Sequence, residues 1–297
     1  MSRAAVRLAA LAIAGALLGA GAARAHVLFD RATLREWTAG AGAVVVAELE
    51  SGPAMWSAPD ASDRQEYFRV RVVETLHGAV APGPLEFFPH AEGFPQFRAG
   101  ERALLFLERT ADHVEFATLA PRFPWFSTQG AGHEWTLAPG ASGDAILEIA
   151  RRLAAWRTTR PSDPRQALRD LVVAQLASGV PRLRRDALSE LVNARSWPGF
   201  FDAATTDALA AWIDGRLLPA TERLALVRVL DGAPGFDADA RLRAMTREPL
   251  AGRELAQLVR SAGTRDDARL RAWLASLAQD AAPEVQREAR AALSLRR

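Results

Sequence analysis

The sequence predicts an α+β protein of two domains, in which a small all-β barrel is followed by an all-α stack of helices. Between residues 44 and 119, short hydrophobic or alternating segments are separated by turns rich in Gly and Pro. From residue 146 onward the hydrophobic period changes to about 3.6 residues, the period of an amphipathic helix. A Gly- and Ala-rich linker at 138–143 divides the two patterns. We therefore expect a β domain at 26–140 and an α domain at 141–297.

The N-terminus has the three parts of a secretory signal peptide, which we assign to residues 1–25. Arg3 and Arg7 precede an apolar segment at 8–18, and Ala23-Arg24-Ala25 fits the small-x-small cleavage rule. No later apolar segment is long enough to span a bilayer. The sequence thus predicts an exported protein, periplasmic or extracellular, with no transmembrane segment after cleavage. The alternative is a buried N-terminal helix.

The β domain is expected to contain five or six short strands. The expected strands lie at 44–47, 67–73, 85–88, 103–107 and 114–119. Short strands separated by Gly- and Pro-containing turns suggest a small closed or partly closed barrel.

Three features follow one another within residues 30–120. A helix-like entry at 32–37 leads to a valine run, and an aromatic-led strand ends in Glu74-Thr75-Leu76-His77-Gly78. The third feature, at 97–107, runs Phe-Arg-Ala-Gly-Glu-Arg-Ala-Leu-Leu-Phe-Leu. In this order the three features resemble the netrin/TIMP-like version of the OB fold. They are core and turn positions, so the resemblance implies a fold and no activity. The chain has no cysteine, so metalloprotease inhibition through an N-terminal Cys is not implied.

The α domain shows helical stripes with a weak internal repeat. Helices are expected at 146–156, 164–178, 181–195, 203–214, 219–231, 237–247, 250–261, 265–279 and 283–295. Segments 181–191 and 283–293 share the pattern P-x-[LV]-x-R-[DE]-A-x-x-x-L, which resembles the second helix of a HEAT repeat. Pro219 begins a looser copy, and the long step from there to Pro283 makes the array irregular. A plain helical bundle is the alternative.

Composition excludes several kinds of chemistry. The chain has no cysteine, and its 37 basic residues are all arginine, so thiolate metal sites, Cys nucleophiles and catalytic lysines are absent. All five histidines lie before residue 140, and the acids of the α domain are expected on exposed faces among arginines. No hydrolase elbow, zincin motif or dinucleotide fingerprint is present. We expect no cofactor and favour a protein that is not an enzyme; a carboxylate-based hydrolase is the least favoured class.

Charge is distributed unevenly between the two predicted domains. Residues 26–140 hold nine arginines and fifteen acidic residues, whereas residues 141–297 hold 25 arginines and twenty acidic residues. An acidic barrel is a poor surface for phosphate backbones, so no nucleic acid is expected there. The opposed charges either steer the domains together or give the α domain an acidic partner, unless they are simply a solvated surface.

One metal site is a candidate. Cleavage after Ala25 places His26 at the mature N-terminus, where its amine and imidazole chelate copper if a second histidine completes the site. His90, His113 and His133 are the candidates for that second ligand. Otherwise His26 is simply the residue that follows the cleavage site.

Two aromatic segments are candidate ligand platforms, namely Trp56 and the stretch 121–126. Packing within the domain is the favoured role, because large aromatic side chains are mostly buried. The function favoured by the sequence is therefore an exported interaction or scaffold protein. Its helical stack would hold a protein partner, and its β domain would be a second binding surface or a cap. The oligomeric state stays open.

Overall fold

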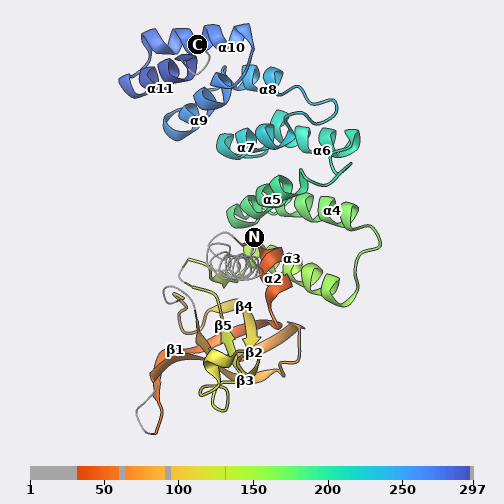
Figure 1. Cartoon of the computed structure of the whole chain (residues 1–297), viewed down its shortest axis with the longest axis vertical. Coiled ribbons are helices and arrows are strands. Elements are labelled where there is room, and N and C mark those ends of the chain that lie inside the picture. The colour runs from red at the N-terminus through yellow and green to blue at the C-terminus, as the bar shows by residue number, and fades with distance from the viewer. Residues whose placement is uncertain (1–31, 60–63, 91–94, 131, 295–297) are drawn as a thin grey trace, which may run out of the picture. The chain divides into compact units, whose positions relative to one another are not determined.

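The computed structural model describes residues 32–59, 64–90, 95–130 and 132–294 (Figure 1). The predicted signal segment and His26 lie outside these residues. The chain divides into two compact units, Met1–Ser162 and Asp163–Arg297. The first contains a sheet and the second contains helices, which confirms the α+β, two-domain layout. Among the described residues, no helix has both the length and the apolar character needed to cross a membrane.

The first unit is built on one six-stranded sheet. Its strands are β1 (Ala43–Ser57), β2 (Arg64–His77), β3 (Gly83–Pro89), β4 (Arg102–Arg109), β5 (Trp125–Ser127) and β6 (Trp135–Thr136). The strand order is β1-β2-β3-β5-β4-β6, and β1 pairs with β4 as well as with β2. The β3–β5 pair is parallel and the other pairs are antiparallel. The pairings therefore lead from β1 through four further strands back to β1.

The predicted strand at 114–119 is wrong. The segment forms a 3-10 turn, η2 (Val114–Phe116), which follows η1 (Thr110–Asp112) and is continued by further turns. Its buried residues are Phe116, Leu119 and Phe123, whose spacing of three and four fits a helical turn, while Val114 is exposed. The strand that pairs with β3 and β4 is β5, which lies further along the chain.

The sheet core follows the alternation of the two long strands. Val45, Ala47 and Leu49 of β1 share a buried cluster with Phe68 and Val70 of β2. A second cluster gathers aromatic side chains from the strands and the β4–β5 connection, namely Tyr67, Phe88, Phe116, Phe123 and Phe126. Most residues of both clusters were expected in strands or in aromatic segments, whereas Leu49 extends the core beyond the expected end of the first strand.

Two helices belong to the sheet unit. Helix α2 (Leu34–Gly40) begins with a capping box in which Thr33 and Glu36 hydrogen-bond each other's backbone N–H groups. Helix α3 (Ala141–Thr158) contacts both α2 and β2. Arg157 donates from Nη1 to the carbonyls of Thr38, Ala39 and Ala41 at 2.7–2.8 Å.

The boundary between the units therefore differs from the one expected after residue 140. Residues 141–143, expected in a linker, form the first turn of α3. Arg151 of α3 also makes a two-pronged ion pair with Glu74 of β2, at 2.7 and 3.0 Å. These contacts group α3 with the sheet, and the division falls between Ser162 and Asp163.

The second unit, here called the helical stack, consists of paired helices. They are α4 (Pro164–Ala177), α5 (Pro181–Ala194), α6 (Ala203–Asp214), α7 (Ala220–Leu230), α8 (Ala238–Met245), α9 (Gly252–Gly263), α10 (Ala268–Asp280) and α11 (Pro283–Ser294). Neighbours pack in pairs, α4 on α5, α6 on α7, α8 on α9 and α10 on α11. The second helices also contact in series, α5 with α7, α7 with α9 and α9 with α11 (Figure 1).

The repeated sequence pattern begins two of these second helices. Pro181 and Pro283 are the first residues of α5 and α11, and the alanine of each copy, Ala187 and Ala289, is fully buried. A proline at the first helical position is favourable because its missing N–H would have no partner there. The long step from Pro219 to Pro283 has a simple cause: the pair α8 and α9 lies between them.

Ion pairs link successive helix pairs, and some are buried, contrary to the expectation of exposed acids. Arg223 of α7 makes two short hydrogen bonds to Glu248, and their side chains are only 6% and 8% exposed. Arg184 of α5 pairs with Glu222 of α7 at 2.7 Å, again with both side chains mostly buried. Arginine–carboxylate ion pairs thus connect successive helix pairs of this unit.

Candidate functional site

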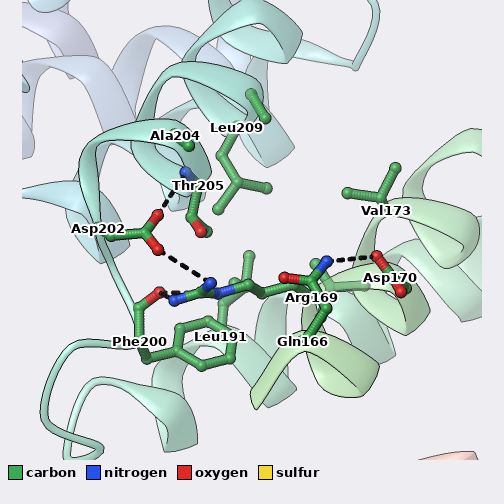
Figure 2. Close-up of a pocket in the computed structure, with 12 residues that line it drawn as sticks. Gln166, Arg169, Asp170, Val173, Leu191, Phe200, Asp202, Ala204, Thr205 and Leu209 are labelled. Atoms are coloured by element: carbon green, nitrogen blue, oxygen red, sulfur yellow. Dashed lines mark hydrogen bonds and ion pairs between the residues drawn. The ribbon is translucent and has the colours of Figure 1, made fainter. Parts of the chain in front are cut away.

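A groove in the helical stack lies between α4, α5, α6 and the loop that joins α5 to α6 (Figure 2). Its volume is about 230 Å³. The floor is apolar and consists of the buried residues Val172, Leu191, Phe200 and Leu209. The rim is polar and consists of Gln166, Arg169, Asp170 and Asp202. The groove therefore joins a hydrophobic surface to hydrogen-bonding groups at its edge.

Local sequence features determine where the helices and the loop that line the groove begin and turn. Asp163 caps α4 through its side chain and is followed by Pro164 at the first helical position. Asp202 caps α6 by accepting a hydrogen bond from the Thr205 N–H at 2.8 Å. Between α5 and α6 the loop turns at Trp197, whose carbonyl accepts from the Phe200 N–H, and this turn buries the Phe200 ring.

Arg169 fastens the loop to α4. Its guanidinium donates to the carbonyls of Gly199 and Phe200 at 2.7–3.1 Å and pairs with Asp202 at 2.9 Å. It also lies over the Phe200 ring, 5.5 Å from the ring centre. Figure 2 shows this guanidinium between the loop and the carboxylate of Asp202. Arg169 is thus a structural clamp with its donors engaged.

The carboxylates at the rim are held in their ionised form or hydrogen-bonded. Hydrogen bonds from the backbone and side chain of Thr205, followed by the charge of Arg169, lower the pKa of Asp202 below its ordinary value. Gln166 donates to Asp170 at 2.8 Å on the opposite side of the groove. A carboxylate whose pKa is lowered in this way is a poor general acid at neutral pH.

Val173 supplies exposed apolar surface beside these polar groups. Its side chain lines the groove next to Asp170 and is 39% exposed (Figure 2). The lining contains one hydroxyl, that of Thr205, and neither histidine nor tyrosine. The groove can therefore bury an apolar group of a ligand, while the polar groups at its rim fix the orientation of that ligand.

No family model matches this chain. No curated protein and no solved structure matches it either. The groove and the packing of elements within each unit are therefore the observations on which a functional proposal rests.

The histidines named as possible metal ligands are only partly brought together. His90 and His113 both contact the rings of Phe116 and Phe126, with ring centres 4.6–6.2 Å apart. His113 also lies 3.0 Å from Glu108. His133 lies instead beside Trp37, with ring centres 6.4 Å apart. Among the described residues, which exclude His26, no group of three or more side chains is arranged to hold a metal ion.

The candidate aromatic platforms pack inside the sheet unit. Trp56 meets the edge of Phe123 at 5.7 Å between ring centres, and both belong to the second hydrophobic cluster. Phe126 is 1% exposed and stacks on Phe88. Most of this aromatic surface is therefore covered by the protein's own side chains.

The groove was not anticipated from the sequence. The three helices around it were predicted, and the Phe200-Phe201 pair before Asp202 is typical of a buried loop next to a helix cap. What the sequence did not reveal is that Arg169, about thirty residues earlier, reaches this loop. The signal available was Arg169 itself, an arginine in an apolar helical stripe that includes Leu168, Leu171 and Val172.

Proposed function

We propose that the chain is an exported, non-enzymatic binding protein whose helical stack holds a protein partner. The groove of Figure 2 is the observation that carries this proposal. Its rim groups already have hydrogen-bond partners within the chain, whereas Val173, Ala204 and Ala208 expose apolar surface along the groove. Such a site gains binding free energy mainly from burying apolar surface.

The size of the groove favours a side chain of a partner over a small molecule. Its volume of about 230 Å³ lies below the ~300–1,000 Å³ of ordinary small-ligand pockets. A single large apolar side chain, inserted from a partner segment, would cover Val173, Ala204 and Ala208. Protein interfaces concentrate much of their binding free energy in anchors of this kind.

The packing of the helices supports a HEAT-type repeat array. Each pair contacts the next through its second helix, in the series α5, α7, α9 and α11. In such arrays each repeat contacts mainly its neighbours, and the series of helices forms an extended surface for a partner. The proposal places the partner on this unit for that reason.

The strand pairings support an OB-type barrel for the first unit. The pairings close through β1, β2, β3, β5 and β4, with the β3–β5 pair parallel. The OB fold is a five-stranded, partly open barrel that commonly serves as a binding module. We propose this unit as a second binding surface.

A retention experiment with two valine variants tests the partner site. The whole chain, Val173→Asp and Val192→Asp are each used to retain proteins from an exported fraction. Val192, on α5, is 55% exposed and does not line the groove, so it is the matched control. A partner kept by the wild type and V192D but lost with V173D is the expected result. If only V192D loses the partner, the binding site lies on another face of the stack. If all three proteins retain the partner, the groove is not the binding site.

Copper binding at His26 remains a second proposal. The observation that favours it is that His90 and His113 contact the same two rings, those of Phe116 and Phe126, and so supply two imidazoles at one aromatic cluster. Copper titration of a chain that begins at His26 is expected to show tight binding, weakened by a one-residue N-terminal extension. Binding that is micromolar or weaker and insensitive to the extension rejects the site.

A further inference from the structure

A second cavity in the helical stack lies between α7, α8 and α9 and has a volume of about 310 Å³. Its polar lining consists of Arg228, Asp231, Arg260, Ser261, Thr264 and Arg265. Three arginines and one aspartate line the cavity, and two carboxylates outside the lining, Asp239 and Glu288, pair with Arg265 and Arg260. The rest of the lining is apolar. This cavity shares no residue with the groove between α4 and α6.

The three arginines differ in how well their charge is compensated. Arg265 is held by Asp231 and Asp239 at 2.5–2.6 Å, so its charge is compensated. Arg260 meets Glu288 at 3.5 Å, and both side chains are 41–52% exposed, which makes the pair weak. Arg228 has no ion pair within the described part of the chain; it donates from Nε and Nη2 to the hydroxyl of Ser261.

The hydroxyl of Ser261 positions Arg228 and leaves the remaining guanidinium donors available. Ser261 is 7% exposed, and its hydroxyl donates a hydrogen bond to the Gln257 carbonyl at 2.9 Å. The hydroxyl of Thr264 is likewise used, since it donates to the Ser261 carbonyl. Donors for a ligand must therefore come from guanidinium groups. A guanidinium matches the geometry of a phosphate or carboxylate with two parallel N–H donors.

We propose that this cavity binds a phosphate-type dianion, free or as a small phosphate monoester. Arg228 is the anchor, and Arg260 is the second cation. Arg228, which has no ion pair among the described residues, and the weakly paired Arg260 together offer two positive charges, which favours a dianion, because a phosphate monoester carries close to two negative charges at pH 7. The volume exceeds that of a single phosphate group, and a small organic substituent would face the apolar wall formed by Val227, Ala238 and Leu242.

Binding to the whole chain at low ionic strength tests the site. Inorganic phosphate, glycerol phosphate and acetate are titrated separately by calorimetry, and thermal unfolding is followed in parallel. The expected result is saturable one-to-one binding of phosphate or its monoester, with acetate at least tenfold weaker and a higher midpoint of unfolding. Tighter binding of glycerol phosphate than of inorganic phosphate identifies a monoester as the preferred source.

Three arginine variants and one serine variant make the test specific. Arg228→Gln is expected to weaken phosphate binding at least tenfold, and Arg260→Gln several-fold. Arg253→Gln, which removes an exposed arginine of α9 outside the cavity, is the matched control and should bind as the wild type. Ser261→Ala keeps every charge but frees Arg228, so a several-fold loss separates an organised site from general charge attraction. Absence of saturable binding, or equal losses in R228Q and R253Q, overturns the proposal.

Discussion

The Arg223–Glu248 pair shows how much a single buried ion pair matters in this protein. Both side chains are almost fully covered, and Arg223 also donates to the Leu218 carbonyl at 3.2 Å. Burying two charges removes their hydration, which the pair recovers only while both partners are present. Removal of either residue therefore leaves an uncompensated charge between helices.

Substitution of Arg223 by alanine is expected to lower the free energy of unfolding by about 3–5 kcal/mol. Urea unfolding of the whole chain, followed by helical circular dichroism, measures this. Arg216→Ala is the control, because the Arg216 side chain is 67% exposed and lies 3.6 Å from the same Glu248. Its loss should stay below about 1 kcal/mol. Equal losses in the two variants would contradict the assigned role of Arg223.

Acid should weaken the helical stack through Glu248. The hydrogen bonds from Arg223 lower the pKa of Glu248 in the folded protein. The unfolded chain, with a glutamate pKa of about 4.3, then binds more protons, so the free energy of unfolding rises with pH. This contribution is complete above the unfolded pKa and is lost as pH falls through the lower folded pKa. We expect the stability of Glu248→Gln to depend less steeply on pH between 3 and 5.5; an unchanged slope in urea unfolding would exclude this source.

At the scale of elements, small residues set how closely helices approach. Gly263 ends α9 where α11 packs, and a Cβ added there would lie 2.6 Å from the Cβ of Ala292. Alanine normally stabilises a helix relative to glycine, by about 1 kcal/mol. Here the clash reverses the sign, because the backbone of Ala292 is also within 3.1 Å.

Gly263→Ala is therefore expected to destabilise the protein by about 1–3 kcal/mol. Thermal unfolding of the whole chain provides the measurement. Gly40 is the matched control, because it also ends a helix and a Cβ there would meet nothing within 4 Å. Gly40→Ala should be neutral or stabilising. A G263A protein as stable as G40A would show that α11 can move away without cost.

Elements with local signals were predictable and long-range partnerships were not. Every helix expected from residue 164 onward is present within three residues of its predicted ends, because Asp caps, Pro starts and the 3.6 period all act locally. The segment 114–119 was wrongly expected to be a strand because its residues alternate between apolar and polar. Its buried residues instead have the spacing of a helical turn. The groove and the attachment of α3 depend on Arg169 and Arg157 reaching distant carbonyls, and no local pattern encodes that.

At the scale of the molecule, α3 determines where the first unit ends. A fragment covering residues 26–162 is expected to unfold cooperatively, whereas a fragment covering 26–140 should have a much lower midpoint or aggregate. The reason is that the shorter fragment exposes the surface of α2 and β2 that α3 covers and loses the ion pair with Glu74. Thermal circular dichroism of the two fragments decides the matter. Equal midpoints would place α3 with the helical stack instead.

The bonds from Arg157 also have a consequence for the order of folding. They join residues 116–119 positions apart, whereas Arg184–Glu222, Arg223–Glu248 and Arg243–Asp267 span 38, 25 and 24 positions. Chains with distant contacts fold more slowly, because long loops must close before those contacts form. The sheet unit is synthesised first. Its helix α2, however, cannot form its hydrogen bonds with Arg157 until the chain has been synthesised past residue 157. The helix pairs of the helical stack can form their native contacts soon after they are synthesised. We therefore expect the helical stack, although it is synthesised last, to fold faster than the sheet unit.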